Sequence, residues 1–441
     1  MSLRRFIDQV QASGDLVTID KAVDTTYELA DIAHALEGRP VLFTTIQGHP
    51  GWRVIAGPCA DRRFFCMDLH VEPADLTAHL ARSLIDPTPP PLVDSAPCQE
   101  VIRENFDLAE LPVLLHLPQD AGRYIASNVV ITEDPELGRN MCYHRLLRLD
   151  GRRFAARIIE NRGTHNAMQK VAGDLPVAIC IGVSQAVHLA ASMSPPPNVD
   201  ELSVAHALSP TPLVKCITND LAVPADAEIV LEGRITRQLA GEGPFMDLTE
   251  TMDIVREQPV IEIDMVTHRR NPIYHALLPG GLEHKILMGM PREPTIMAEI
   301  NKVTRCTGAH ITPGGASWLH AVVQIDSQGP DDAREAIEAA FAGHGSLKHV
   351  WVVDRDIDIF DPADVEWAQA TRFQADKDFY LFPERPGSSL DPSGTHRPGL
   401  KSRTAKAGFD CTIPWGADPA KFRRGEYGTV NLDDYLRPSN P

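Results

Sequence analysis

The sequence lacks the short motifs that mark the commonest enzyme classes. It contains neither G-x-G-x-x-G nor a P-loop, so an ordinary dinucleotide or nucleoside triphosphate site is unsupported. G-x-S-x-G and H-E-x-x-H are absent too, which removes the most frequent hydrolase signals. The eight cysteines form no C-x-x-C pair and no zinc-ligand spacing. We expect most of them to be small buried residues in a reducing compartment.

Positive charge and long apolar runs are also scarce. The 42 Lys and Arg residues face 60 Asp and Glu, and the net charge of -18 argues against nucleic acid or an anionic membrane as partner. No apolar run approaches the roughly 20 residues that span a bilayer. The first residues resemble no signal peptide, so a cytoplasmic location is expected. Hydrophobic residues make up 43% of the chain and charged residues 23%, which is typical of globular proteins.

A chain of 441 residues predicts two or three domains. We predict an N-terminal α/β domain over 1–110, whose end is signalled by a proline cluster. Runs of β-branched residues predict a β-barrel or sandwich over 111–300, and the stretch PIYHALL is counted among its strands. A strand–helix–strand pattern predicts a C-terminal α/β domain over 301–441. Its tail, from Pro383, is rich in Pro, Gly and Ser and is predicted to be an irregular lid or arm.

Arginine is concentrated in one predicted β-hairpin, whose two alternating runs meet at Asp150-Gly151. Arg152 and Arg153 flank this turn and are best explained as exposed, surface-paired side chains. The remaining arginines form a candidate anion site, because a guanidinium group binds carboxylate or phosphate with two parallel hydrogen bonds. They are Arg139, Arg145, Arg148, Arg157 and Arg162.

A second unusual stretch, GEGPFMD, places Glu242 and Asp247 around a Gly-Pro-Phe core. Taken alone, this pattern fits a solvated turn as well as a shaped functional loop. Asn140 and Glu201 carry hard oxygen donors suited to Mn²⁺ or Mg²⁺. Glu201 is equally suited to the first turn of a helix, so the residues alone favour a structural role for both.

Several stretches together resemble the UbiD family of prenylated-FMN-dependent (de)carboxylases. The segment VKCITNDLAVPADAEIVLEG followed by GEGPFMD is similar to the signature block of that family. The stretches around Asn140 to Arg145, RII, RG, SMSPPPNVDE and AKAGFDCT resemble its other conserved segments, in the same order. The matches run from about residue 100 to 412. The resemblance implies a flavin-reductase-like split β-barrel for the central domain.

The resemblance also implies the catalytic groups of a carboxy-lyase. Arg145, Glu242 and Asp247 fall on the family's arginine and two carboxylates. Asp247 is implied as the proton donor after CO2 leaves, with Glu242 and Arg145 holding it in place. The prenylated flavin is implied as the electron sink that makes decarboxylation at an sp² carbon feasible. Asn140 and Arg145 are five residues apart, so simple alternation along one strand would put them on opposite faces unless a bulge intervenes.

The cofactor and metal residues follow from the same resemblance. Asn140 and Glu201 are implied as ligands of Mn²⁺ or Mg²⁺, with K⁺ as a further ion. Lys406 is implied at the flavin phosphate. Some family members have a histidine ligand where this chain has Gly163, and His165 is not expected to replace it. The remaining residues implied at the flavin are Tyr143, His144, Arg145, Arg157, Ile158, Ile159, Arg162 and Gly163.

The substrate is the least specified element. His284 and Arg292 resemble positions that hold a second polar group of the substrate in the furandicarboxylate-decarboxylating branch, although Arg292 could equally cap the helix that follows it. The expected substrate is a small aromatic, heteroaromatic or α,β-unsaturated carboxylic acid. A flavin prenyltransferase as cofactor supplier and a homodimer or larger homo-oligomer are also implied. The alternatives are a plain FMN-dependent oxidoreductase and a non-catalytic subunit of a decarboxylase complex.

Overall fold

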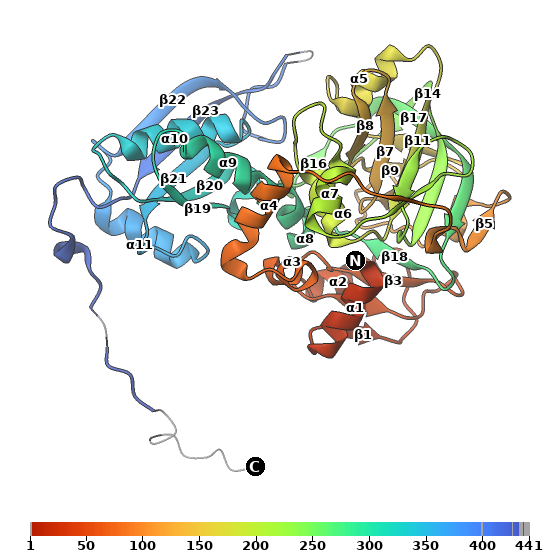
Figure 1. The fold of residues 1–441 in the computed structure, drawn as a ribbon, viewed down its shortest axis with the longest axis horizontal. Helices are drawn as coiled ribbons and strands as arrows, with labels where there is room; N and C mark the ends of the chain where they lie inside the picture. Colours follow the sequence, from red (N-terminus) through yellow and green to blue (C-terminus); the bar gives the residue numbers. More distant parts are fainter. Residues whose placement is uncertain (1, 398–399, 426, 432–434, 436–441) are drawn as a thin grey trace.

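The computed structural model describes residues 2–397, 400–425, 427–431 and 435. Figure 1 shows two lobes: one holds the N-terminal and central sheets, and the other holds the C-terminal sheet. Helices α4 (Leu76–Ile85), α8 (Leu282–Gly289) and α9 (Glu293–Ile300) lie between the lobes, and α4 contacts both α7 (Glu201–Leu208) and α9. None of the helices among the described residues is long and apolar enough to cross a bilayer.

The N-terminal sheet has four strands in the order β1-β2-β3-β18. Helix α1 begins at a capped end, where the Ser2 side chain accepts a hydrogen bond from the backbone N–H of Arg5. Its buried residues recur on one face, as expected for an amphipathic helix. The elements are α1 (Leu3–Ala12), β1 (Val17–Ile19), α2 (Glu28–Ala35), β2 (Val41–Phe43), β3 (Arg53–Ala56), α3 (Arg62–Leu69) and β18 (Ile273–Ala276).

Strand β18 corrects one expectation. The stretch PIYHALL was assigned to the central region, yet β18 pairs in parallel with β3 and completes the N-terminal sheet. All four of its residues are buried, so both of its faces are covered. A parallel partner some 200 residues away in the chain leaves no local sequence signal, which is why alternation could not place it.

The central sheet has nine strands, of which eight follow the order β6-β9-β10-β17-β14-β11-β7-β8 and β5 pairs with β17. Within the described residues its end strands β6 and β8 do not pair with each other, so no closed barrel forms. The strands are β5 (Val101–Arg103), β6 (Tyr124–Ile125), β7 (Val129–Asp134), β8 (Gly138–Cys142), β9 (Leu146–Arg148), β10 (Arg153–Ala156), β11 (Leu175–Ile181), β14 (Ile229–Glu242) and β17 (Arg256–His268).

The long pair β14–β17 positions the catalytic stretch. A register shift lies between Glu232 and Gly233, where a Cβ at Gly233 would stand 2.0 Å from the carbonyl oxygen of Glu262. Only glycine permits that approach, and the bulge bends the strand. Strand β14 ends at Glu242, and a two-stranded hairpin, β15 (Phe245–Met246) and β16 (Met252–Asp253), follows it.

Short elements cover the central sheet and complete its core. Alternate residues of β11 enter two different hydrophobic clusters, so this strand is buried on both faces. The predicted hairpin is confirmed: β9 and β10 are antiparallel and their connection contains Asp150-Gly151. The covering elements are α5 (Gly163–Lys170), α6 (Gln185–Ser192), α7, and a three-stranded sheet of β4 (Leu92–Val93), β12 (Leu213–Lys215) and β13 (Ala222–Pro224).

The C-terminal sheet has the order β19-β20-β21-β23-β22. The predicted strand–helix–strand unit is confirmed, with β20 and β21 parallel on either side of α10 in the chain. The tail from Pro383 was predicted to be irregular, but β22 continues to Pro386 and β23 pairs with both β21 and β22. The elements are β19 (Cys306–Ile311), β20 (His320–Ile325), α10 (Asp332–Gly343), β21 (His349–Asp354), α11 (Pro362–Arg372), β22 (Phe379–Pro386) and β23 (Arg403–Asp410).

Candidate active site

Arg145 lies where the chain leaves one strand and enters another. Asn140 belongs to β8, which pairs with β7, whereas β9 begins at Leu146 and pairs with β10. The carbonyl oxygen of Arg145 accepts a hydrogen bond of 3.1 Å from the backbone N–H of Arg157, which continues β10. A break between two strands, rather than a bulge in one, therefore resolves the expected conflict between Asn140 and Arg145.

Three carboxylates surround the Arg145 guanidinium group, and we call these four residues the Arg145 cluster. Glu242 accepts from Nε at 2.8 Å and from Nη2 at 3.0 Å, and Asp247 accepts from Nη1 at 2.9 Å. Asp253 accepts from Nη2 at 2.8 Å. The Arg145 side chain is 11% exposed and that of Glu242 is fully buried. Burial alone would lower the pKa of Arg145, but Glu242, Asp247 and Asp253 together raise it above its usual value.

Tyr124 and Phe245 form a wall behind this cluster. The Tyr124 hydroxyl donates to Glu242 Oε1 at 3.2 Å and accepts from the backbone N–H of Gly243 at 3.0 Å. The Phe245 ring lies 4.0 Å from the Tyr124 ring and 5.5 Å from the Arg145 guanidinium carbon. Burial, with the charge of Glu242, raises the pKa of Tyr124, so the hydroxyl stays protonated. Gly243 has a φ of +97°, and a Cβ there would stand 2.6 Å from the Ile254 carbonyl oxygen, so the loop requires glycine.

His284 lies on α8, within electrostatic range of Asp247 and Arg145. Its Nδ1 accepts a hydrogen bond of 3.1 Å from the backbone N–H of Gly280, so the proton of the neutral ring is on Nε2. Burial lowers the pKa of His284, although the charge of Asp247 opposes this shift. His284 therefore offers its Nε2–H as a hydrogen-bond donor near Asp247, the predicted proton donor. A contact of His284 with the substrate, as predicted, needs such a donor.

Asn140 and Glu201 belong to two elements that are in contact, strand β8 and helix α7. The carboxylate of Glu201 accepts a 3.0 Å hydrogen bond from the backbone N–H of Met141, the neighbour of Asn140. Burial raises the pKa of Glu201 to about 7, and this outweighs the opposing effects of the Met141 hydrogen bond and the Arg139 charge. A Cβ at Gly163 would stand 2.1 Å from Asn140 Oδ1, so glycine makes the space that the amide occupies.

Asn140 and Glu201 both carry oxygen donors, the ligand type that Mn²⁺ and Mg²⁺ prefer, and these ions commonly complete their coordination with phosphate and water. No group of three His, Cys, Asp or Glu side chains suited to a metal occurs in the described part of the chain. His165 does not supply a third ligand here, because its Nδ1 accepts from the backbone N–H of Asn161 at 3.3 Å.

The residues predicted at the flavin surround the break between β8 and β9. His144 is buried, with Nδ1 3.0 Å from the Arg157 carbonyl oxygen and Nε2 2.9 Å from Thr164 Oγ1. The Tyr143 hydroxyl lies 2.6 Å from His188 Nδ1. Ile158 is buried, whereas the Ile159 side chain is 50% exposed. Arg162 occupies the N-cap position of α5 without a side-chain capping bond, and Gly163 is the first residue of this helix.

Two cations on the C-terminal side of the boundary between the lobes have no carboxylate partner among the residues that the structure describes. Arg292 Nη1 donates to Ser194 Oγ, its Nε is buried without a partner, and its guanidinium carbon is 5.7 Å from the Trp318 ring centre. Burial lowers the pKa of Arg292 to about 10, and the charge of Arg162 adds to this effect. Arg292 occupies the N-cap position of α9, but its side chain makes no capping hydrogen bond there.

Lys406 is a second unpaired cation in this group. It lies on β23, donates to the Gly345 carbonyl oxygen at 2.8 Å and lies 4.8 Å from the Phe341 ring centre. Burial lowers its pKa to about 8, with smaller contributions from Lys401 and Arg385. No carboxylate pairs with Lys406 among the described residues. An ammonium group in this setting fits a phosphate.

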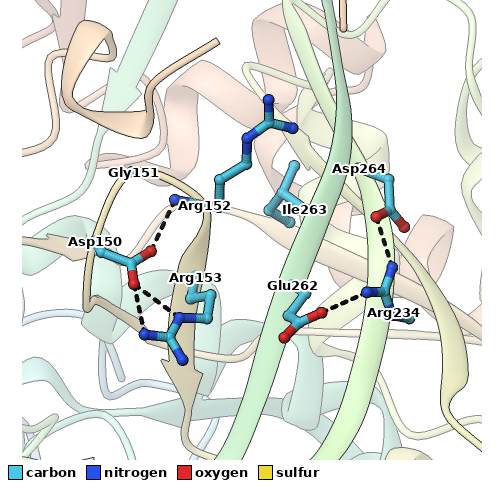
Figure 2. Close-up of a pocket in the computed structure, with 8 residues that line it drawn as sticks. All are labelled: Asp150, Gly151, Arg152, Arg153, Arg234, Glu262, Ile263 and Asp264. Atoms are coloured by element: carbon cyan, nitrogen blue, oxygen red, sulfur yellow. Dashed lines mark hydrogen bonds and ion pairs between the residues drawn. The ribbon is translucent and has the colours of Figure 1, made fainter. Parts of the chain in front are cut away.

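Of the two arginines beside the hairpin turn, Arg153 is paired with a surface acid, as predicted, whereas exposed Arg152 donates to the carbonyl oxygen of Glu104 at 3.0 Å. Figure 2 shows them lining an open hollow, where Arg153 pairs with Asp150 at 2.7 Å. On the opposite wall Arg234 pairs with Glu262 and Asp264 at 2.5 and 2.6 Å. Since the Arg153 and Arg234 charges already have carboxylate partners, this hollow is not an anion site.

The structure adds residues that the sequence did not single out. Besides Tyr124 and Asp253, the residues His116 and Asp120 form a buried pair near the Gly-Pro-Phe stretch. Burial lowers the pKa of His116 to about 4 and raises the pKa of Asp120 to about 6. A buried hydrogen-bonded chain also runs from Tyr143 through His188 and His275 to Glu283. None of these lies in a recognisable motif, and only the β-hairpin register brings Asp253 opposite Phe245.

Three family models cover nearly the whole chain. They describe the N-terminal domain (residues 7–84), the Rift-related domain (92–282) and the C-terminal domain (285–411) of 3-octaprenyl-4-hydroxybenzoate carboxy-lyase, or UbiD. A curated relative, the anhydromevalonate phosphate decarboxylase of Methanosarcina mazei, is 40% identical over 419 residues. The match covers 93% of this chain and 96% of the relative.

Solved structures give the same result. The UbiD-class enzyme HmfF from Pelotomaculum thermopropionicum, in complex with FMN, superposes with a TM-score of 0.93 at 37% identity, covering 99% of this chain and all of HmfF. An evolved dimeric form of HmfF in complex with prFMN superposes with a TM-score of 0.90 at 36% identity, with the same coverage.

Proposed function

The chain belongs to the UbiD family of carboxy-lyases, and we propose that it uses prenylated FMN to decarboxylate a small α,β-unsaturated acid that carries a second anionic group. The observation that carries this proposal is the Arg145 cluster, in which one guanidinium group binds both Glu242 and Asp247. Neither an FMN oxidoreductase nor a scaffold subunit needs this buried arrangement of an arginine and acids.

The residues present fit the cofactor. Asn140 and Glu201 would hold a divalent cation at the flavin phosphate, Lys406 would balance the phosphate charge, and the residues around the break between β8 and β9 would contact the ring system. When bound, prenylated FMN supplies the electron sink for loss of CO2. The flavin-binding solved relatives support this assignment. As the family resemblance implies, we expect a homo-oligomer that obtains its cofactor from a flavin prenyltransferase.

The side chains then have separate tasks. Asp247 donates the proton that replaces CO2 on the substrate carbon, because it is the cluster carboxylate with the fewest hydrogen bonds and the greatest exposure, at 23%. Glu242 and Tyr124 hold Arg145 in place from the buried side. His284 offers its Nε2–H to the substrate beside Asp247. The Phe245 and Tyr124 rings exclude water from the back of the cluster.

The substrate tail is assigned from the unpaired cations. Arg292 lacks a carboxylate partner in the described part of the chain and lies within electrostatic range of Arg162 and His344, and Lys406 lies within range of the same His344. Such an excess of positive charge suits a phosphate better than a neutral group. The name of the Methanosarcina mazei relative supports anhydromevalonate phosphate as the first substrate to test. The aromatic and heteroaromatic acids expected from the sequence are the second candidates, supported by the similarity of His284 and Arg292 to the furandicarboxylate branch.

The test is direct. The chain is co-expressed with a flavin prenyltransferase, purified anaerobically with Mn²⁺, and assayed for CO2 release from anhydromevalonate phosphate and from furan, pyrrole, benzoic and cinnamic acids. Release from the phosphate alone supports the first candidate, and release from a ring acid alone supports the second. Unmodified FMN with NAD(P)H oxidation and no CO2 would overturn the proposal in favour of an oxidoreductase. No flavin at all would favour a scaffold.

Replacing Arg292 with alanine is expected to raise KM for the phosphorylated acid about 10- to 100-fold, with little change in kcat. The reason is the loss of one charge-assisted hydrogen-bonding group that substrate and transition state use equally. The matched control is Arg305→Ala, which removes an exposed arginine that pairs with Asp326 on the same lobe. An equal rise in KM for an acid without an anionic tail would contradict the assignment of Arg292.

A further inference from the structure

Trp318 lies against the guanidinium group of Arg292, and the proposed function gives it no task. The guanidinium carbon is 5.7 Å from the centre of the Trp318 ring, and Nη1 donates to Ser194 Oγ. An aromatic face and a hydroxyl orient a guanidinium group without cancelling its charge. Arg62 shows the contrast, because its Nη1 donates to both oxygens of the Glu293 carboxylate. The contacts of Arg292 therefore fix its direction and leave its charge available to a ligand.

The Trp318 ring is itself held by two further contacts. Its Nε1–H donates to Ser388 Oγ at 3.1 Å, and Ser388 lies in the segment that follows β22. The His344 ring lies 4.4 Å from the Trp318 ring with the two planes 75° apart, which is an edge-to-face contact. Because these contacts come from two separate segments, the ring has a fixed orientation toward Arg292.

The backbone that carries Trp318 has an unfavourable conformation. Ala316 and Ser317 have φ values of +57° and +46°, in the left-handed region that residues with a Cβ rarely adopt. A Cβ at Gly289 would stand 2.7 Å from the Ser317 carbonyl oxygen, so this turn packs directly on the end of α8, three residues before Arg292. Backbone strain of this kind is concentrated at functional sites. Here the strained turn places Trp318 beside Arg292.

Two buried nitrogen atoms at this site have no hydrogen-bond partner among the described residues. They are Nε of Arg292 and Nε2 of His344. His344 is 7% exposed, and burial together with the charge of Arg292 lowers its pKa to about 3, with a smaller contribution from Lys406. Since buried polar atoms normally have partners, two unpaired atoms beside two cations indicate that the site takes a polar ligand.

We propose that Trp318 determines specificity for the anionic tail of the substrate by holding Arg292 in position. This inference rests on the proposed function in its choice of a phosphorylated acid as substrate. Trp318 is a positioning residue in this assignment, because it acts through Arg292 and touches no reacting atom. The same arrangement recurs at Lys406, whose ammonium group lies 4.8 Å from the Phe341 ring centre and donates to a carbonyl oxygen rather than to a carboxylate.

Replacing Trp318 with leucine keeps an apolar side chain but removes the aromatic face. KM for the phosphorylated acid is expected to rise about 3- to 30-fold, the range of one cation–π contact, with kcat little changed. KM for an acid without an anionic tail should stay the same. Trp318→Phe keeps an aromatic face and should recover most of the loss. The matched control is Trp415→Leu, which removes an exposed tryptophan that follows β23.

A double-mutant cycle tests whether Trp318 acts through Arg292, with the binding of inorganic phosphate to the full-length protein measured by calorimetry. Trp318→Leu and Arg292→Ala should each weaken binding, and Trp318→Leu should cause no further loss once residue 292 is alanine. Additive losses, no loss in Trp318→Leu, or a wild type that binds no phosphate would overturn the proposal. Phosphate that responds to Lys406→Ala alone is bound at the residue implied for the flavin phosphate, and this result would overturn it too.

Ser388→Ala is the second variant if Trp318→Leu does not fold. It removes only the hydrogen bond to Trp318 Nε1 and is expected to weaken phosphate binding about 2- to 10-fold, the usual contribution of one hydrogen bond. Unchanged binding in Ser388→Ala would then overturn the proposal.

The phosphate measurement needs neither cofactor nor turnover, so it fails independently of the proposed function. A protein that binds phosphate through Trp318 and Arg292 but releases no CO2 would overturn the decarboxylase assignment and support the role of Trp318. Release of CO2 from a ring acid, without phosphate binding, would overturn the role of Trp318 alone.

Discussion

Replacing Asp247 with asparagine is expected to lower the rate of CO2 release about 10²- to 10⁴-fold, the usual contribution of a positioned general acid. Asparagine has nearly the same shape, but it can accept only one of the two hydrogen bonds, because Arg145 and Leu248 donate to different oxygens of Asp247. It cannot deliver a proton to carbon. The expected loss is therefore chemical rather than structural, and it should lie in kcat with KM little changed.

The measurement is CO2 release by the variant after its prenylated FMN content has been matched to that of the wild type. Asp264→Asn serves as the matched control, because it makes the same substitution at an exposed ion pair with Arg234. A variant at position 247 that keeps most of the wild-type rate would contradict the role of Asp247. Solvent deuterium appearing in the product at an unchanged rate would point to a different proton donor.

The sequence could identify candidate catalytic residues but not their arrangement. Arg145, Glu242 and Asp247 were predicted from stretches that resemble the UbiD family, and the structure brings the three side chains together. The hairpin at Asp150-Gly151 and the strand–helix–strand unit around α10 were predicted because their signals are local. In each case the residues that carry the signal lie within a few tens of positions of each other.

Long-range pairing explains what could not be predicted. Asp253 reaches Arg145 only because β15 and β16 fold back on each other, and nothing in its own neighbourhood marks it. Strand β18 completes a sheet whose other strands begin some 200 residues earlier. Strand β23 follows a stretch rich in Pro, Gly and Ser, and its conformation is fixed by β21 on one side and β22 on the other. Arg292 likewise has no carboxylate partner among the described residues because the fold brings no acidic side chain to it. A local stretch of sequence cannot show this.

Replacing Glu293 with glutamine is expected to lower the free energy of unfolding by about 3–5 kcal/mol, the usual cost of breaking one side of a buried ion pair. Glu293 is fully buried at the start of α9. It accepts two hydrogen bonds from Arg62 Nη1, at 2.9 and 2.7 Å, and contacts His310 Nδ1 at 3.1 Å. Since Arg62 belongs to α3 and His310 to β19, the carboxylate joins the two lobes.

The pH dependence of this effect follows from the sign of the shift. Burial alone would raise the pKa of Glu293, but the charge of Arg62 and the His310 contact lower it below its usual value of 4.5. A lowered pKa stabilises the fold fully above 4.5, and this stabilisation is lost as the pH falls through the lowered value. Denaturant midpoints of wild type and Glu293→Gln should therefore differ most near neutrality and converge in acid.

Glu299→Gln on the same helix removes an exposed pair with Lys302 and should cost less than about 1 kcal/mol at any pH. If the difference in denaturant midpoint between wild type and Glu293→Gln persists unchanged in acid, packing rather than charge holds α9 against its neighbours. Because Arg292 is the residue next to Glu293, a loosened α9 should also weaken binding of the substrate tail, which couples the stability of this contact to KM.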